Sequence, residues 1–397
     1  MTLFLTILAV YFAEKFKPFN YPKYIHIPLE NWFSYIENKF DSGTNKDGIF
    51  AWLVAVFLPT LLTLWIVVCL YDIAYFLGVI FSALVLYFAV GFNFVCSRFY
   101  LKIKKNLKQL YYINSNKNNG NSKRKTDAEI AKQNQHLLKE SRRLLAAWLG
   151  ENSNFANNIT KFSQAANSAN LMANLFKQNK DKDSEDKNSK ENSKENSNEN
   201  SNDNKNPQKE PKFISDFSRL PQHKISLIST MGSLLMSQRH WFGTLLWFIC
   251  FGAVGVVFYR LSLAAGQFWK NKQNDSLFSN FAAKVNDFVD GVSQYLTSLI
   301  FALVGNFSPA IFGLNYVLNN QQSLKINACF ENTLIWNSAN GALNYFSDDF
   351  HEANKNNINI KLMQRCENLI WKSFMFIFIV LLIFAVMEIA QNLLLLI

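Results

Sequence analysis

The sequence predicts an all-α fold: a polytopic membrane helix bundle with amphipathic helices and a disordered cytosolic insert. Three observations support this prediction: several long apolar runs, a basic tract that follows one of them, and a polar insert of about 140 residues. The mean hydropathy of −0.01 averages these unlike parts. Runs rich in Phe, Leu and Ile suit lipid, whereas a segment rich in Asn, Lys and Ser cannot bury enough apolar surface to fold alone.

The first apolar runs predict a transmembrane hairpin over residues 49–97. A helix needs about 20 apolar residues to cross roughly 30 Å of hydrocarbon. The runs from Ile49 to Tyr71 and from Ile73 to Val95 are long enough, and only Asp72 separates them. Before this hairpin, residues 1–48 are expected to form a membrane-dipping helix or short tilted span at Thr2 to Ala13, followed by a cytosolic connector.

The basic tract fixes the predicted orientation. No acidic residue occurs between Asp72 and Asp127, while nine Lys and Arg residues follow the second run. Such charge stays on the cytoplasmic side of a membrane, so residues 98–240 are predicted to be cytosolic in a multi-pass protein of a bacterial inner (plasma) membrane. A net charge of +11 could also suit nucleic acid. Because much of the charge flanks apolar runs, a lipid bilayer is the expected partner, and nucleic acid is not.

The insert is divided by composition. Residues 98–177 form a basic cytosolic segment with an amphipathic helix that ends near Gly150, and residues 178–212 are a disordered low-complexity insert. Arg142 and Arg143 lie on the wetter side of that helix. The helix is expected to pack on the cytosolic face of the bundle, or these arginines bind anionic lipid or a phosphate ligand.

Residues 213–397 are predicted to form a C-terminal membrane domain. Trp241 to Tyr259 is a third clear span, and Phe374 to Ile397 is the last. Between them, Tyr295 to Leu318 is uncharged but is broken near Gly305 and Pro309. It is expected to be a span, a re-entrant pair of half-helices or an interfacial segment.

An amphipathic helix is predicted just before this broken segment. It lies either along the membrane surface or against the bundle, and the side on which the C-terminus lies depends on that choice. Its apolar residues recur at helical spacing, opposite Lys284, Asp287 and Asp290. They are Phe278, Phe281, Val285, Phe288, Val289, Val292 and Leu296.

Motifs for common chemistries are missing from the sequence. It contains no phosphate loop, dinucleotide fingerprint, zinc-protease motif or nucleophile elbow, and its five cysteines are isolated. We therefore predict no catalytic residue, no metal site and no cofactor. A polar group at Asp348, Asp349, His351 and Glu352 is expected to be a solvated loop rather than a cation site.

Glu388 is an ionisable residue within the last apolar run. Such a group is costly at membrane depth and by default suggests a role. We expect it to pair with Arg239 or Arg260 of the third span. A part in transport is the alternative.

Three stretches resemble the AmpE family of inner-membrane proteins. They are "MTLFLTILAVYFAEKF" at the start, "RHWFGTLLWFICFGAVGVVFYRLS" from Arg239 and "YLTSLIFALVGNFSPAI" from Tyr295, and "NSANGALNYF" from Asn337 fits the same pattern. The resemblance covers about half the chain and excludes the low-complexity insert. It implies a signalling modulator of β-lactamase induction or cell-wall stress, with an unknown protein partner.

The AmpE family is similar in turn to the CobD/CbiB adenosylcobinamide-phosphate synthases. Three pieces match: "ESRRLLAAWLG" from Glu140, "LLWFICFGAVGVVFYR" from Leu245, and the amphipathic run into "YLTSLIFALVG". Those enzymes carry Gly-Arg-Asp-Thr after the first piece, where this chain has Gly150 to Ser153, and a Glu-Asn-Thr segment before the second, where it has "SQRHWFG" from Ser237. The departures favour a non-enzymatic role over a divergent synthase. Arg239 and His240, at the position of the second signature, become candidates for a ligand or partner site, with interfacial anchoring as the alternative.

Overall fold

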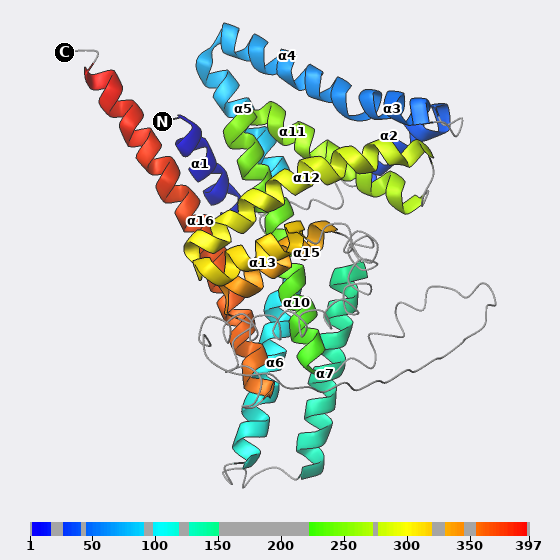
Figure 1. The fold of residues 1–397 in the computed structure, drawn as a ribbon, viewed down its shortest axis with the longest axis vertical. Helices are drawn as coiled ribbons and strands as arrows, with labels where there is room; N and C mark the ends of the chain where they lie inside the picture. Colours follow the sequence, from blue (N-terminus) through cyan, green and yellow to red (C-terminus); the bar gives the residue numbers. More distant parts are fainter. Residues whose placement is uncertain are drawn as a thin grey trace, which may run out of the picture.

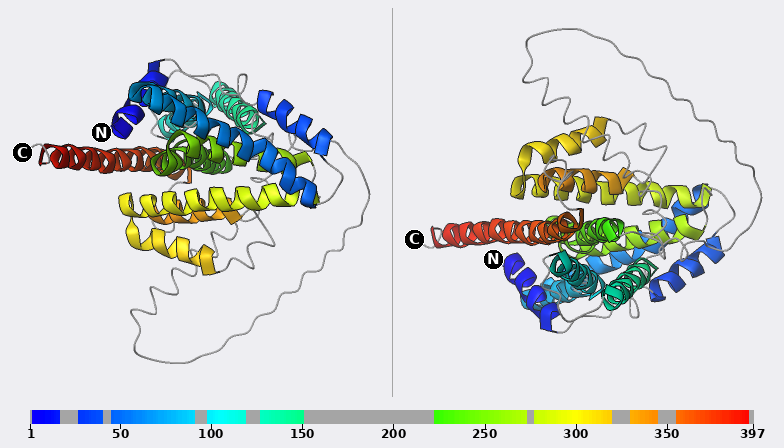
Figure 2. Two further views of the ribbon diagram at one scale, coloured as in Figure 1. Left: turned by 90° about the horizontal axis from the view of Figure 1, so that it is seen from above. Right: turned by 90° about the horizontal axis from the view of Figure 1, so that it is seen from below.

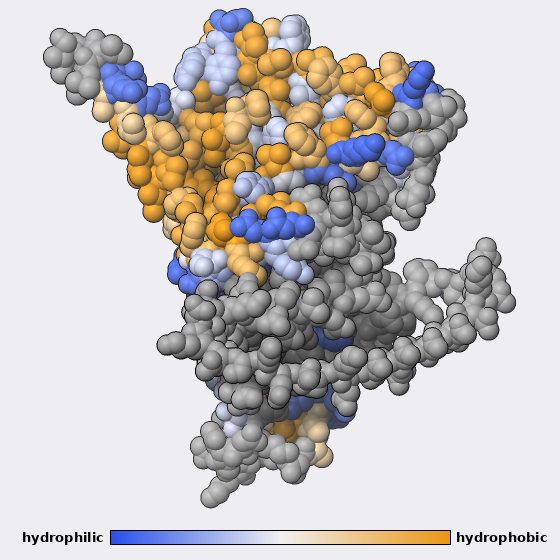
Figure 3. All heavy atoms as spheres, in the orientation of Figure 1, coloured by the Kyte–Doolittle hydropathy of each residue, from blue (hydrophilic) through white to orange (hydrophobic). Residues whose placement is uncertain are grey.

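The computed structural model describes residues 2–16, 27–40, 45–90, 98–118, 127–150, 222–272, 277–319, 330–344 and 355–394. All elements in these ranges are helices, which confirms the all-α class. Three stretches are long and apolar enough to cross a membrane: Lys46–Ile73, Lys224–Trp269 and Ile360–Asn392. Apolar side chains cover the upper part of the molecule, where α1, α4, α5, α12 and the end of α16 lie (Figures 1 and 3). The chain is therefore a helical membrane protein.

The helices form three layers when the molecule is seen from above or below (Figure 2). On one side lie α12 (Leu277–Val304), α13 (Phe307–Asn319) and α15 (Phe330–Ala342). The middle holds α10 (Gln222–Ser237), α11 (Gly243–Lys272) and α16 (Lys355–Leu394). On the other side are α1 (Thr2–Phe16), α5 (Tyr75–Val90), α6 (Arg98–Asn118) and α7 (Asp127–Gly150).

The described part of the predicted hairpin, up to Val90, forms two adjacent helical arms, but only the first is long enough to be a candidate span, since α5 has 16 residues. The first arm runs through α3 (Asn45–Trp52), a π-helical turn η2 (Leu53–Phe57) and α4 (Leu58–Ile73). Ala74 is extended and ends this arm, and α5 returns along α4. Most large apolar side chains of α4 are exposed, as expected of a surface that faces lipid.

The N-terminal helices pack on the middle layer. The ring of Tyr11 on α1 lies 5.5 Å from that of Phe374 on α16. Within the predicted connector, α2 (Ile27–Phe40) places Phe33 against Phe268 and Trp269 of α11, with ring centroids 5.8 Å apart in both pairs. These aromatic contacts fix both short helices to the bundle.

The α6 and α7 helices form an antiparallel pair that extends below the apolar part (Figure 1). The rings of Tyr100 and Trp148 lie 6.4 Å apart where the pair begins. The Tyr100 hydroxyl donates a 2.9 Å hydrogen bond to the carbonyl of Met363 on α16, and Lys104 is ion-paired with Glu367. The amphipathic helix predicted to end near Gly150 is thus confirmed, and its apolar face packs against α6 and α10.

The third predicted span lies within an apolar stretch of sufficient length, but it is sharply bent at Gly252. This residue has φ 63° and ψ −148°, a conformation that only glycine adopts easily. Beyond it the chain folds back, so that Trp247 stacks on Tyr259 with ring centroids 6.1 Å apart. In a straight helix these residues would be about 18 Å apart along the axis. The α11 helix is therefore a helical hairpin, with a short first arm up to Phe251 and a longer second arm from Ala253.

The broken segment from Tyr295 to Leu318 consists of the end of α12 and all of α13. The break falls at Gly305 and Asn306. The backbone N–H of Asn306 donates a 3.1 Å hydrogen bond to the carbonyl of Ala342. A side chain at Gly305 or Gly341 would collide with backbone atoms of the facing helix, so glycine permits this close packing of α12, α13 and α15. The predicted break is confirmed.

The amphipathic helix before this segment packs against the bundle, along the second arm of α11. Its orientation differs from the prediction. Asp290 is fully buried, whereas Phe288 is 70 % exposed. The expectation that Asp290 lies on the wet face was wrong, because the exterior of a membrane bundle is apolar and its polar side chains turn inward.

Some predictions fall outside the described residues. They concern the low-complexity insert at 178–212, with all of 151–221, and the polar group from Asp348 to Glu352. Cys96 and Cys329 lie outside as well, while Cys69, Cys250 and Cys366 form no disulfide.

Candidate functional site

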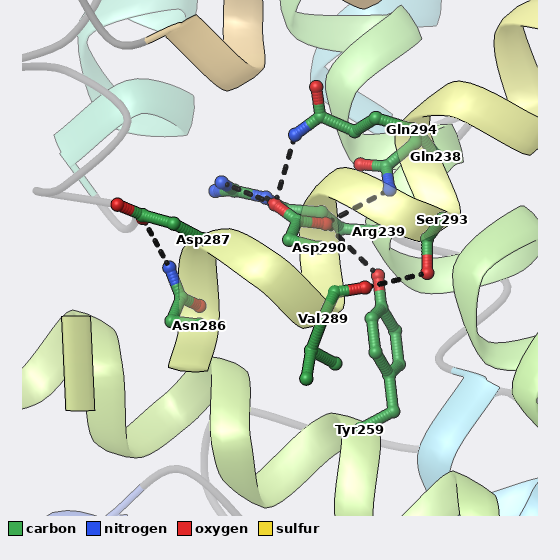
Figure 4. A network of polar contacts seen from close by, with 9 residues as sticks. All are labelled: Gln238, Arg239, Tyr259, Asn286, Asp287, Val289, Asp290, Ser293 and Gln294. Atoms are coloured by element: carbon green, nitrogen blue, oxygen red, sulfur yellow. Dashed lines mark hydrogen bonds and ion pairs between the residues drawn. The ribbon is translucent and has the colours of Figure 1, made fainter. Parts of the chain in front are cut away.

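A π-helical turn places the predicted site residues. The helix α10 is followed by η4 (Gln238–Phe242), which leads directly into α11. The wider turn aims the side chains of Gln238 and Arg239 at α12, on the opposite side of the bundle interior (Figure 4). Such π-helical insertions are frequent at functional sites.

The carboxylate of Asp290 is the centre of this site. Its Oδ1 accepts hydrogen bonds from Gln238 Nε2 at 3.0 Å and from the Tyr259 hydroxyl at 3.2 Å. Its Oδ2 accepts from Gln294 Nε2 at 3.2 Å, and from Nε and Nη2 of Arg239 at 3.0 and 2.9 Å. One buried carboxylate of α12 is therefore bonded to η4, to the second arm of α11 and to the next turn of α12 itself.

These contacts saturate the acceptor capacity of Asp290. A carboxylate offers about four lone-pair positions, and five donor contacts already occupy the two oxygens. The Arg239 side chain is only 13 % exposed. An ion pair this deep is maintained only when its remaining hydrogen bonds are made, as they are here. In this arrangement Asp290 serves as an anchor and has no free position for a substrate proton or a cation.

A second row of contacts supports the anchor. The indole of Trp247, in the first arm of α11, donates to the Ser293 hydroxyl at 2.9 Å. Ser293 in turn donates to the carbonyl of Val289 at 3.2 Å. Trp247 also stacks on Tyr259. The two arms of α11 are thus held to the same turn of α12.

His240 lies beside the anchor and contacts a second guanidinium. Its Nδ1 is 3.2 Å from Nη2 of Arg260. Because a guanidinium only donates, Nδ1 is the acceptor and the ring carries its proton on Nε2. The pair links η4 to the second arm of α11 independently of Asp290.

Two amide oxygens of the site have no partner among the described residues. They belong to Gln238 and Gln294, both fully buried. Each amide donates a hydrogen bond from its Nε2 to Asp290, which turns its oxygen away from the carboxylate (Figure 4). A hydrogen-bond donor is the complement that these oxygens require.

The structure brings together Arg239 and His240 but not the other predicted residues. Arg142 is half-buried and Arg143 is exposed on α7, and neither is among the residues bonded to Asp290. Glu388 is exposed near the end of α16. It follows Phe374, which contacts Trp241 at 4.6 Å, by 14 residues, or about 21 Å of helix. Arg239 forms its ion pair with Asp290 on α12, and the pairing of Glu388 with Arg239 or Arg260 stays a prediction.

Asp290 is the residue that the sequence reasoning missed. The signal was present, since an arginine at the start of an apolar helix requires an acid at similar depth. Two acids on the neighbouring helix, Asp287 and Asp290, meet that requirement by composition. Only the packing of α12 decides between them, leaving Asp287 exposed and Asp290 buried.

In the described ranges no three His, Cys, Asp or Glu side chains are grouped so as to hold a metal ion. Searches of family models, curated proteins and solved structures find no match to this chain.

Proposed function

We propose that the chain is a multi-pass protein of a bacterial inner membrane and acts as a non-enzymatic, AmpE-like signalling modulator in β-lactamase induction or cell-wall stress. The segment 98–240 then lies in the cytosol, where an unknown protein partner contacts it. The resemblance of the apolar segments to that family supports the proposal, as does the concentration of apolar side chains on the upper part of the molecule, above the α6–α7 pair (Figures 1 and 3).

One observation carries the mechanism: the Arg239–Asp290 pair joins η4, at the end of α10, to α12. Arg239 follows directly on α10, which packs against α6, α7 and α16. Asp290 belongs to α12, whose outer face is apolar and exposed. A displacement of α10 by a cytosolic partner must either break the buried pair or move α12 with it. Buried pairs favour such two-state responses because an intermediate position leaves a charge unpaired.

A small-solute transporter is the second candidate, and the bend at Gly252 favours it. Interrupted helices at membrane depth recur in transporters, where unwound backbone lines the substrate path. A divergent CobD/CbiB-type synthase is the third reading, and it depends on the same family resemblance.

A deletion strain scored in two assays tests the proposal. We expect the deletion to change β-lactam induction and to leave cobinamide salvage intact. Complementation with Arg239→Ala should fail, and Arg239→Lys should restore the response partly, because lysine keeps the charge but not the two contacts that Nε and Nη2 of Arg239 make with Oδ2 of Asp290. Exposed Lys132→Ala on α7 is the control and should complement fully.

Each reading predicts a different result. Loss of cobinamide salvage would replace the modulator by a synthase. Normal induction in the deletion strain, together with substrate uptake by vesicles that contain the purified chain, would replace it by a transporter. Complementation by Arg239→Ala as good as by Lys132→Ala would remove the site from the mechanism.

A further inference from the structure

The α6 helix presents a row of lysines that takes no part in the site described above. Lys102, Lys105 and Lys108 are exposed and recur at every third residue, so they share one face. The opposite face is apolar and buried, with Ile103 and Leu107 fully enclosed. Lys104, which lies between the two faces, is ion-paired with Glu367. Packing of the buried face therefore fixes the direction of the exposed lysines.

The neighbouring helix adds cations at the same level. Tyr100 and Trp148 lie beside each other in the antiparallel pair. Five residues from this contact along each helix come Lys105 and Arg143, both exposed. Lys139 lies one turn further along α7 and is also exposed. We name these five residues the basic collar: Lys102, Lys105, Lys108, Lys139 and Arg143.

The collar lies close beneath the apolar part of the molecule. Lys104 contacts Glu367. Seven residues after Glu367, at Phe374, begins an uncharged stretch that continues to Met387. Seven residues of helix measure about 10 Å, and phospholipid headgroups extend roughly 5 to 8 Å beyond the hydrocarbon on each side. The three lysines of α6 span about 9 Å along the axis, close to the Debye length of about 8 Å at physiological salt.

We propose that the basic collar binds the anionic headgroups of phospholipids in the membrane leaflet next to α6. Clusters of Lys and Arg directly beside a membrane span attract such lipids. Carboxylates are few in this region: α6 has no acidic residue, Glu367 is already paired, and Glu140 on α7, next to Lys139, is half-buried. The proposal is independent of the signalling role, since it requires only that α6 lie beside the membrane.

A lipid titration of the full-length chain in detergent tests the proposal. Phosphatidylglycerol should raise the melting temperature, and phosphatidylcholine at equal concentration should raise it less. The triple variant K102Q/K105Q/K108Q should need at least about tenfold more phosphatidylglycerol to reach half of the maximal rise in melting temperature. The double variant K139Q/R143Q, on the other helix, should also need more phosphatidylglycerol than the wild type. Salt at about 0.5 M should reduce the wild-type response, because it screens exposed charges.

The matched control removes the same charge elsewhere. Lys46, Lys132 and Lys284 are exposed residues outside the collar, and K46Q/K132Q/K284Q should respond like the wild type. An equal loss in this control would show a general effect of net charge and overturn the proposal. Soluble polyglutamate is the second arm. If it stabilises the chain as strongly as phosphatidylglycerol does, the collar is a docking surface for an acidic protein, and the lipid assignment is wrong.

Discussion

Asp290 and Arg239 illustrate how single residues are placed in a membrane bundle. Each would be costly alone at this depth, and together they satisfy one another through two hydrogen bonds. Arg239 could be nominated from the sequence because it stands at the start of an apolar run. Its partner could not, because Asp287 and Asp290 are one turn apart and only tertiary packing buries one of them.

Asp290→Asn should destabilise the chain more than any substitution of an exposed carboxylate. The change leaves the Arg239 guanidinium without its counter-charge, which typically costs about 3 kcal/mol or more. The melting temperature of the full-length chain in detergent measures the loss. Asp287→Asn, one turn away and exposed, should stay within about 0.5 kcal/mol.

The double variant Asp290→Asn with Arg239→Gln separates the charge from the packing. It removes the uncompensated cation, so part of the lost stability should return. Arg239→Gln should therefore cost less stability in the Asp290→Asn background than in the wild type. If it lowers the melting temperature equally in both, the two side chains are not coupled, and the anchoring role is wrong.

At the scale of elements, the positions of the described helices along the chain could be predicted from the sequence better than their directions in space. Apolar runs located α4, α5 and α16, and the predicted break at Gly305 is present. The bend at Gly252 was not foreseen, because hydropathy gives length and composition but not direction. At Gly255 the helix is closely approached by the carbonyl of Trp247, which belongs to the other arm of the same helix.

Gly252→Ala tests this bend. No atom lies within 4 Å of the position that an added Cβ would take, so steric contact with neighbours would cost nothing. The positive φ nevertheless strains an L-residue, and we expect a loss of about 1 to 3 kcal/mol in thermal unfolding.

Gly291 provides the control for the bend. Its added Cβ would also meet nothing within 4 Å, but it lies inside α12 with no positive φ. Gly291→Ala should be neutral or should stabilise the chain by about 0.5 to 1 kcal/mol. Equal behaviour of the two alanine variants would mean that α11 is not bent at Gly252.

At the scale of the whole molecule, the prediction of a helical membrane protein depended on uninterrupted apolar runs and is confirmed by three candidate spans. The orientation of the chain in the membrane depends on the distribution of positive charge. The tip of the first hairpin at Asp72 and the α6–α7 pair should lie on opposite sides of the membrane.

Labelling from outside intact cells measures this orientation. In a chain without its native cysteines, Asp72→Cys should react with an impermeant maleimide. Gln135→Cys, exposed on α7, should react only after the membrane is permeabilised. Reaction of Gln135→Cys in intact cells would invert the topology and place the basic collar outside.

The α16 helix has 40 residues and so measures about 60 Å, twice the thickness of the hydrocarbon. Only its second half is apolar enough to stay in lipid, and the first half projects beyond it as a rigid rod. A tilt of about 10° within the bilayer would swing the far end by roughly 5 Å. The Lys104–Glu367 and Tyr100–Met363 contacts lie on this projecting half. A change in membrane thickness that tilts α16 would therefore displace the α6–α7 pair.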